Sequence, residues 1–274
     1  MNLKEALDLA FVSNDKWRVG NGRETAEINS RHVRRILGDD FQIEDTSSAT
    51  FAKITRVLQM EEYAPSTINK ITSVLSKLLT ELAQTGYSVP IVKFKRQSVK
   101  QGRHKFYKEE EMEKILNATR RREDFLLLHD SIEFALKTGC RQGEMLALTT
   151  DKVDIVRREV LFVDTKNGSD HWLPLHSALV PILERRLEQC IDERIFPWDS
   201  AGQLRNAFYK SMDLAGLEKG RAWHTIRHTT ATWMVDRGVP LRAIMGVLNH
   251  SNVATTLRYA KASDKAVSSA IDAL

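Results

Sequence analysis

The spacing of the apolar residues constrains this sequence most, because they recur at intervals of three and four along most of the chain. That spacing places them on one face of a helix. The clearest case is residues 66–82, whose predicted buried face carries Ile68, Ile71, Leu75, Leu78, Leu79 and Leu82. Pro65 and Ser66 favour a helix start there. Similar spacing predicts helices at 2–11, 25–37 and 50–60, so residues 1 to about 90 are expected to form a small helical bundle.

The rest of the chain keeps helical spacing but interrupts it once. Helices are predicted at 109–120, 124–137, 141–148, 177–190, 204–215, 226–237, 241–248 and 253–260. Residues 153–155, 160–163 and 171–175 instead predict three short strands, and Asn167-Gly168 favours a tight turn between the last two. The predicted fold class is mainly α with a small antiparallel sheet, an α+β arrangement.

A basic stretch separates the two parts. Residues 91–108 contain seven Lys and Arg and no Asp or Glu, with Pro90 before them and Gly102 within. We predict an interdomain linker over 93–107, between domains at 1–92 and 108–274. The stretch is either a solvated loop or a strap along a phosphate backbone, where Lys and Arg release counterions. The candidate DNA-binding residues are Lys93, Lys95, Arg96, Lys100, Arg103 and Lys105.

Composition excludes several classes of protein. The 274 residues are 42% hydrophobic, enough for real cores, and 41 Lys and Arg against 36 Asp and Glu give a net charge of only +5. No run of about 18 apolar residues predicts a membrane span, and the N-terminus does not resemble a secretory signal. The two cysteines, Cys140 and Cys190, suit a reducing cytoplasm and give no disulfide framework.

Several common kinds of chemistry are missing from the sequence. The glycine-rich phosphate-binding loop that ends in Lys-Ser or Lys-Thr does not occur. His224 and His228 are spaced like zinc ligands on a helix, but Thr225 stands where a metalloprotease of that pattern has Glu. No compact group of carboxylates suggests a two-metal nuclease. We therefore expect neither a metal site nor a cofactor.

Isolated polar residues stand among apolar ones in the second part of the chain: Arg141, Lys166, His224, Arg227, His250 and Tyr259. Taken singly, each has an ordinary structural explanation. Arg141 can pair with Glu144 three residues on, and Lys166 can be a solvated turn residue. Tyr259 can pack its ring in a core.

Taken together, these residues resemble the tyrosine recombinases, also called phage-type integrases, in order and spacing. The segments that carry the resemblance are Thr138-Gly139-Cys140-Arg141-Gln142-Gly143-Glu144, Thr165-Lys166-Asn167-Gly168, His224-Thr225-Ile226-Arg227-His228-Thr229, Leu248-Asn249-His250-Ser251 and Thr255-Thr256-Leu257-Arg258-Tyr259. One departure is Asn249, where the family usually has Gly; Asn also tolerates left-handed backbone geometry. The resemblance implies a helical core-site DNA-binding domain followed by a tyrosine-recombinase catalytic domain.

The resemblance also implies roles at the matching positions. Tyr259 would attack a DNA phosphodiester and remain joined to its 3′ phosphate. Arg141 and Arg227 would clamp the non-bridging oxygens of that phosphate, and Lys166 would protonate the leaving 5′ oxygen.

Three further positions complete the implied site. His224 would help accept the proton of Tyr259, and His250 would hydrogen-bond the phosphate. Glu144 matches a supporting acidic position. Cys140 fills a variable position and is expected to be a small buried residue without a reactive thiol.

General chemistry agrees with this set. Phosphoryl transfer builds negative charge on oxygens that two guanidiniums can contact, so magnesium is not required for charge. A phosphotyrosine bond keeps the energy of the broken DNA bond, so rejoining needs no ATP.

The function expected from the resemblance is site-specific recombination that integrates or excises a phage or mobile element. The partners would be double-stranded recombination sites, further copies of the chain in a tetramer, and accessory DNA-bending or directionality proteins. An apolar stripe in the tail, Val267, Ala270, Ile271 and Leu274, would dock on a neighbouring copy or pack on its own domain.

Two alternatives belong to other functional classes. A type IB topoisomerase shares the Arg, Lys and Tyr chemistry, but the compact helical N-terminal part and the second histidine series argue against it. A non-catalytic DNA-binding regulator could keep the fold, but the complete catalytic set argues against that role.

Overall fold

A computed structural model describes residues 1–99, 105–120, 122–163, 170–190, 192–218 and 220–260. The chain divides into two compact units, Met1–Gln101 and Gly102–Leu274. Each unit has its own apolar core. No helix within the described ranges is both long enough and apolar enough to cross a lipid bilayer.

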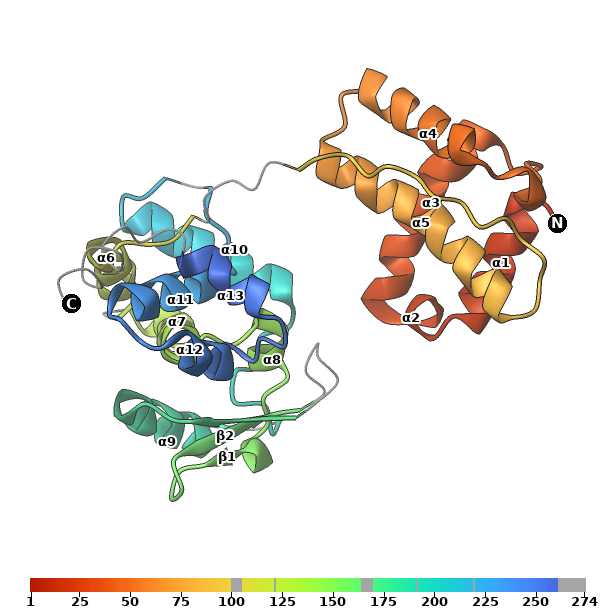
Figure 1. The fold of residues 1–274 in the computed structure, drawn as a ribbon. Coiled ribbons are helices and arrows are strands. Elements are labelled where there is room, and N and C mark those ends of the chain that lie inside the picture. Colours follow the sequence, from red (N-terminus) through yellow and green to blue (C-terminus); the bar gives the residue numbers. More distant parts are fainter. Residues whose placement is uncertain (100–104, 121, 164–169, 191, 219, 261–274) are drawn as a thin grey trace, which may run out of the picture. The chain divides into compact units, whose positions relative to one another are not determined.

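The first unit is a helical bundle built around its longest helix (Figure 1). Its elements are α1 (Leu3–Ser13), α2 (Asp15–Arg18), α3 (Gly20–Leu37), a 3-10 turn (Ile43–Asp45), α4 (Ser48–Met60) and α5 (Pro65–Gln84). Helix α5 contacts α1, α3 and α4 and buries the apolar face that the sequence predicted. The four-residue α2 was not predicted, because a single turn has no periodicity; the Asn14 side chain caps it and Trp17 buries its ring.

The basic stretch after α5 begins as an extended segment on the first unit. The Phe94 ring stacks on Phe51 with centroids 4.1 Å apart. The amide of Asn69 makes two hydrogen bonds to the Gln97 backbone, donating to its carbonyl and accepting from its N–H, both at 2.8 Å. Because side chains alternate along an extended chain, Lys93 and Lys95 face solvent while Phe94 faces inward.

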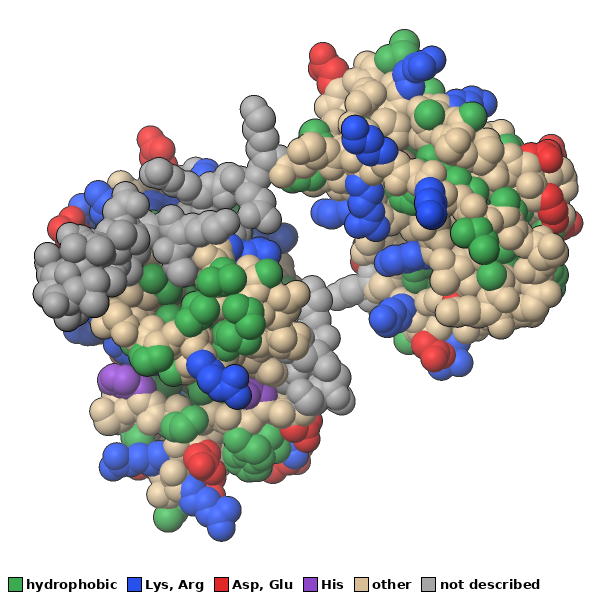
Figure 2. Space-filling model, viewed as in Figure 1, with side chains coloured by type: hydrophobic (Ala, Val, Ile, Leu, Met, Phe, Trp, Pro, Cys, Tyr) green, Lys and Arg blue, Asp and Glu red, His purple; other side chains and the backbone are tan. Residues whose placement is uncertain are grey.

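These lysines belong to a basic surface on the first unit. One groove of about 550 Å³ is lined by Lys16, Lys70, Lys77 and Arg96, and another of about 540 Å³ by Arg56, Lys93 and Lys95. Figure 2 shows Lys and Arg side chains gathered on one face of this unit, with Asp and Glu mostly at its rim.

The second unit is mainly helical with one small sheet. Its helices are α6 (Glu109–Arg120), α7 (Leu126–Thr138), α8 (Gln142–Leu146), α9 (Val180–Glu188), α10 (Ala201–Leu214), α11 (Thr225–Asp236), α12 (Leu241–Leu248) and α13 (Val253–Ala260), with 3-10 turns at Glu123–Phe125, Thr150–Lys152 and Ser177–Leu179. Helices α7 and α11 pack against each other in the middle of the unit (Figure 1). The predicted mainly helical α+β fold class is confirmed.

The sheet has the order β1-β2-β3 and is antiparallel, with strands Val153–Asp154, Glu159–Phe162 and His171–Pro174. Its alternate residues Val160, Phe162 and Leu173 are buried in the core of the unit. The Phe162 ring meets Phe134 of α7 edge to face at 6.3 Å, which fixes the sheet against the central helices. The predicted Asn167-Gly168 turn lies outside the described residues.

Candidate active site

Helix α11 carries three polar side chains on one face. His224 is its N-cap, and Arg227 and His228 follow on the first turn. Residues three and four apart are neighbours on a helix surface, so the local sequence alone brings these side chains together. The rings of His224 and His228 meet edge to face with centroids 4.9 Å apart.

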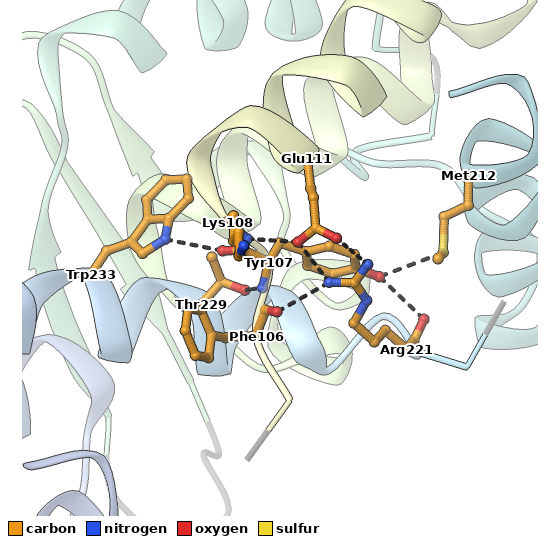
Figure 3. A network of polar contacts seen from close by, with 8 residues as sticks. All are labelled: Phe106, Tyr107, Lys108, Glu111, Met212, Arg221, Thr229 and Trp233. Carbon is orange, nitrogen blue, oxygen red and sulfur yellow. Dashed lines mark hydrogen bonds and ion pairs between the residues drawn. The ribbon is translucent and has the colours of Figure 1, made fainter. Parts of the chain in front are cut away.

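The segment that leads into α6 is anchored on α11 (Figure 3). The buried N–H of Tyr107 donates to Thr229 Oγ1 at 2.9 Å, and Trp233 Nε1 donates to the Tyr107 carbonyl at 3.1 Å. The Arg221 guanidinium lies over the Tyr107 ring at 4.3 Å and makes two hydrogen bonds to Glu111, at 2.7 and 2.5 Å. Helix α11 is therefore fixed by contacts at the residue after its polar face, Thr229, and about one turn further on, at Trp233.

Arg227 joins the ends of two helices. Its Nη1 donates to the Gly139 carbonyl at 2.7 Å, after α7, and its Nη2 donates to the Leu248 carbonyl, the last residue of α12. Carbonyls at helix C-termini lack intrahelical partners and carry partial negative charge. These contacts compensate the burial of a charged residue that is only 5% exposed. Burial, followed by the charge of Arg141, lowers the Arg227 pKa from its usual value.

The two helix ends approach each other closely because of their backbone geometry. Gly139 has φ +64°, and a Cβ there would lie 2.6 Å from Leu248 Cδ2, so only glycine fits without displacement. Asn249 caps α12 in the left-handed region, at φ 48° and ψ 54°. Asn249 therefore adopts the left-handed geometry that asparagine tolerates in place of glycine.

Arg141 reaches the same place from the N-terminus of α8. Its Nη1 donates to Glu144 Oε1 at 2.5 Å, and its backbone N–H donates to Glu144 Oε2 at 2.7 Å. Its Nη2 lies 3.4 Å from the Asn249 carbonyl oxygen. The sequence-predicted Arg141–Glu144 pair is confirmed, and it orients the guanidinium toward the end of α12.

Tyr259 is almost fully buried, with 3% of its surface exposed, and packs with Ala231, Ile244 and Leu248. Its hydroxyl lies 2.7 Å from His228 Nδ1. Burial raises the Tyr259 pKa above its usual value, although Arg227 and Arg258 pull it down.

His250 follows α12 and lies parallel to the Tyr259 ring, with centroids 6.5 Å apart. Its Nδ1 is 2.8 Å from the hydroxyl of the buried Thr256. Burial and then the charges of Arg227 and Arg141 lower the His250 pKa to about 4. The imidazole is therefore neutral at pH 7.

These side chains line one cavity of about 330 Å³, together with Thr255 and Ser251. Its lining residues are Arg141, His224, Arg227, His228, Asn249, His250, Ser251, Thr255, Arg258 and Tyr259. The lining includes three arginines and no carboxylate, so the cavity suits an anion with several oxygens, such as a phosphodiester. Among the residues that the structure describes, no group of three or more His, Cys, Asp or Glu could hold a metal ion.

The structure thus brings together Arg141, His224, Arg227, His250 and Tyr259, with Glu144 beside them. Lys93, Lys95 and Arg96 are exposed on the first unit, and Lys105 is exposed on the second. Lys166, Lys100, Arg103 and the tail 261–274 lie outside the described residues.

Sequence reasoning did not propose five of the lining residues as site residues: His228, Asn249, Ser251, Thr255 and Arg258. His228 was considered only as a metal ligand with His224, although the four-residue spacing already placed the two on one face. Cys140 behaves as predicted, since it is 5% exposed and burial raises its thiol pKa to about 12.

Residues 105–266 match the phage integrase family. Tyrosine recombinase XerA of Thermococcus onnurineus is 28% identical over 258 residues, which cover 88% of this chain and 86% of that protein. Tyrosine recombinase XerA of Pyrococcus horikoshii is 23% identical over 282 residues, covering 91% of this chain and 96% of that protein.

Solved structures share the fold. A lambda integrase dimer bound to a COC′ core site superposes with a TM-score of 0.71 at 18% identity, covering 95% of this chain and 77% of that one. The Tn1549 transposon integrase in complex with circular intermediate DNA gives a TM-score of 0.73 at 15% identity, covering 94% and 95%.

The family match spans more than half of the chain and includes every segment that carried the resemblance. The chain belongs to the phage integrase family. It is a tyrosine recombinase, an enzyme that transfers DNA strands. The expectation of a recombinase, rather than a topoisomerase or a non-catalytic regulator, is confirmed.

Proposed function

We propose that this chain cuts and rejoins DNA at specific sites through a covalent 3′-phosphotyrosine at Tyr259. One observation carries the proposal: a single cavity holds the Tyr259 hydroxyl together with Arg141, Arg227 and His250. The tyrosine oxygen attacks phosphorus while the bond to the 5′ oxygen breaks. Arg141 and Arg227 stabilise the charge on the non-bridging oxygens, and neutral His250 hydrogen-bonds the phosphate.

Two proton transfers accompany this exchange of bonds. Lys166 gives a proton to the leaving 5′ oxygen, and His224 helps accept the proton that Tyr259 loses. Both roles rest on the family resemblance of these positions. Rejoining is the reverse reaction, in which the 5′ hydroxyl attacks the phosphotyrosine and releases the Tyr259 oxygen, so it consumes no ATP.

We assign DNA binding to the first unit and the linker. In this proposal residues 1–92 form a core-site DNA-binding domain, 93–107 an interdomain linker and 108–274 the catalytic domain. The exposed Lys93, Lys95 and Arg96 support the assignment, because the contacts of Phe94 and Gln97 hold the basic stretch that carries them on the first unit. Lys100, Arg103 and Lys105 extend the same charged run.

The role of this basic stretch can be tested by the salt dependence of DNA binding. Changing Lys93, Lys95 and Arg96 to Ala should lower the slope of log affinity against log salt by about 0.9 for each lost phosphate contact. A slope equal to that of the wild type would remove these residues from the DNA interface.

The finer biological role that we propose is integration and excision of a phage or mobile element by a tetramer on paired DNA sites. The support is a likeness in fold to a lambda integrase tetramer bound to a Holliday junction, with a TM-score of 0.72, and to the Tn1549 transposon integrase. Accessory DNA-bending or directionality proteins would set the direction. A plasmid assay with candidate element ends should yield integration and excision products; products only from directly repeated chromosomal sites would favour dimer resolution.

The covalent step is tested by trapping on a nicked half-site, from which the cleaved end diffuses away. Wild-type protein should become attached to the 3′ phosphate in a denaturant-resistant, protease-sensitive adduct, and Tyr259→Phe should form none. Tyr209→Phe is a matched control, since Tyr209 packs on the apolar core of the same unit. An adduct formed by Tyr259→Phe, or one that maps to another tyrosine, would overturn the proposal.

A further inference from the structure

His228 makes a direct contact with the nucleophile of the proposed reaction. Its Nδ1 lies 2.7 Å from the Tyr259 hydroxyl, and the two ring centroids are 5.7 Å apart. The contact connects the first turn of α11 with the last turn of α13. The Tyr107 contacts to Thr229 and Trp233 hold helix α11 (Figure 3), and His228 lies on this fixed helix.

Tyr259 needs a proton acceptor at this place. The protonated phenol is a poor nucleophile, and burial keeps the Tyr259 pKa above its usual value despite Arg227 and Arg258. A general base must lie within about 2.6–3.2 Å of the proton that it takes. The neutral form of His228 with its proton on Nε2 offers the Nδ1 lone pair at that distance.

Five of the other ionisable groups in and beside the cavity are less suited to this task, and the sixth, His224, contacts the His228 ring edge to face with centroids 4.9 Å apart. Arg141, Arg227 and Arg258 are donors without an acceptor site. Glu144 is committed to Arg141 through both carboxylate oxygens. His250 already uses Nδ1 with Thr256, and its lowered pKa makes it a weak base.

We propose that His228 is a catalytic residue of this enzyme, the group that accepts the proton of Tyr259 during strand cleavage. The inference rests on the proposed role of Tyr259. The O–H bond of Tyr259 breaks and its proton moves to Nδ1, while the electron pair forms the new bond from oxygen to phosphorus. The bond from phosphorus to the 5′ oxygen breaks with its pair, and that oxygen takes the proton of the general acid. The His228 imidazolium returns its proton to Tyr259 on rejoining, and His224 supports the His228 ring edge to face.

Two substitutions separate proton acceptance from positioning. In His228→Asn the side-chain oxygen can replace Nδ1 as a hydrogen-bond acceptor but is not basic, whereas His228→Leu removes both properties. Both variants should cleave about 10²–10⁴ times more slowly than wild type, with unchanged melting temperature and site binding. A wild-type cleavage rate in His228→Asn would overturn the proposal, since it would leave His228 a positioning role only.

A matched control comes from the same second unit. His176 Nδ1 accepts the Ala178 N–H at 3.1 Å outside the cavity, so His176→Asn keeps its hydrogen bond in the same way. This variant should cleave at the wild-type rate, which would show that a His-to-Asn change alone does not slow the enzyme.

The pH profile and a modified substrate identify the step. The wild-type cleavage rate should level off at pH values above the pKa of its base. The His228→Asn rate should instead keep rising about tenfold per pH unit, because hydroxide then has to remove the Tyr259 proton.

A substrate with sulfur in place of the bridging 5′ oxygen has a leaving group that needs no proton. It should relieve the defect of Lys166→Ala and leave that of His228→Asn; restoration of His228→Asn would place His228 on the leaving group and overturn the inference.

Failure of this inference is distinguishable from failure of the proposed function. If the wild-type adduct maps to Tyr259 while His228→Asn cleaves normally, only the role of His228 is lost. If no adduct maps to Tyr259, the proposed function falls first.

Discussion

The Glu144 carboxylate binds Arg141 both at its backbone and at its guanidinium, accepting from the backbone N–H at 2.7 Å and from Nη1 at 2.5 Å. The carboxylate therefore fixes the start of α8 and the direction of the guanidinium together. The two side chains are 10% and 21% exposed, so solvent screens the pair only in part.

Replacing Glu144 with Gln should weaken catalysis without removing any group that touches the phosphate. The amide keeps one acceptor but turns an N–H toward Arg141 Nη1, so the guanidinium loses its orientation. Because small misplacements of catalytic groups are costly, we expect cleavage to fall about 10- to 100-fold. Single-turnover cleavage measures this, with Glu188→Gln on the exposed side of α9 as the control; equal rates in both variants would contradict the orienting role.

Arg141→Ala and Arg227→Ala should differ in stability more than in catalysis. Each removes a preorganised donor to developing charge, which costs about 2.7–4 kcal/mol of transition-state stabilisation. Arg227→Ala also leaves the Gly139 and Leu248 carbonyls without their donor, at about 1–3 kcal/mol for a buried unsatisfied group. Urea unfolding together with cleavage rates tests this, and equal unfolding free energies would refute the structural role of Arg227.

Cleavage should proceed in EDTA. Two arginines supply the positive charge that magnesium supplies in many phosphoryl-transfer sites. The measurement is covalent adduct formation on the half-site with and without EDTA and added magnesium. A strict need for a divalent ion in the cleavage step would show that the roles of Arg141 and Arg227 are misassigned.

His250 should make the free protein less stable in mild acid. Its folded pKa of about 4 lies below the unfolded value near 6.5, so the unfolded chain binds the proton first as the pH falls. This contribution to stability is complete above about pH 6.5 and declines toward pH 4, by at most about 3 kcal/mol. Urea unfolding at pH 7 and pH 5 should show a smaller loss for His250→Gln than for wild type; an unchanged loss would assign the effect to other groups.

Thr229→Val should destabilise the second unit through the contacts in Figure 3. The substitution keeps the shape of a fully buried side chain but removes the acceptor of the buried Tyr107 N–H, which costs about 1–3 kcal/mol. Thr232→Val is the control, because the Thr232 hydroxyl only donates to the His228 carbonyl one turn earlier. Equal melting temperatures in the two variants would contradict this role of Thr229.

Local sequence accounts for most of the fold. Predicted helices at 109–120, 241–248 and 253–260 agree with α6, α12 and α13 at both ends. The three predicted strands lie within one or two residues of β1, β2 and β3. These elements follow from the period of their apolar residues, which is a property of neighbours along the chain.

The candidate site was partly readable in the same way. His224, Arg227 and His228 share a face of α11 through their spacing, and Arg141 and Glu144 pair across one helical turn. The break at Gly139 was also visible in the sequence. Nothing local showed that Leu248 occupies the space of a Cβ at Gly139, because that approach depends on how α7 and α12 pack.

The sequence by itself therefore determined most of the helices, the short strands and the identity of the polar residues that the family resemblance singled out. The tertiary structure decided which of them meet. Arg227 reaches two helix ends that are 109 residues apart in the chain, and the Tyr259 hydroxyl lies 2.7 Å from Nδ1 of His228, on another helix. Such contacts depend on how whole helices rotate and pack against one another. Burial of their apolar faces fixes this packing. The spacing of residues along the chain does not specify which helices meet.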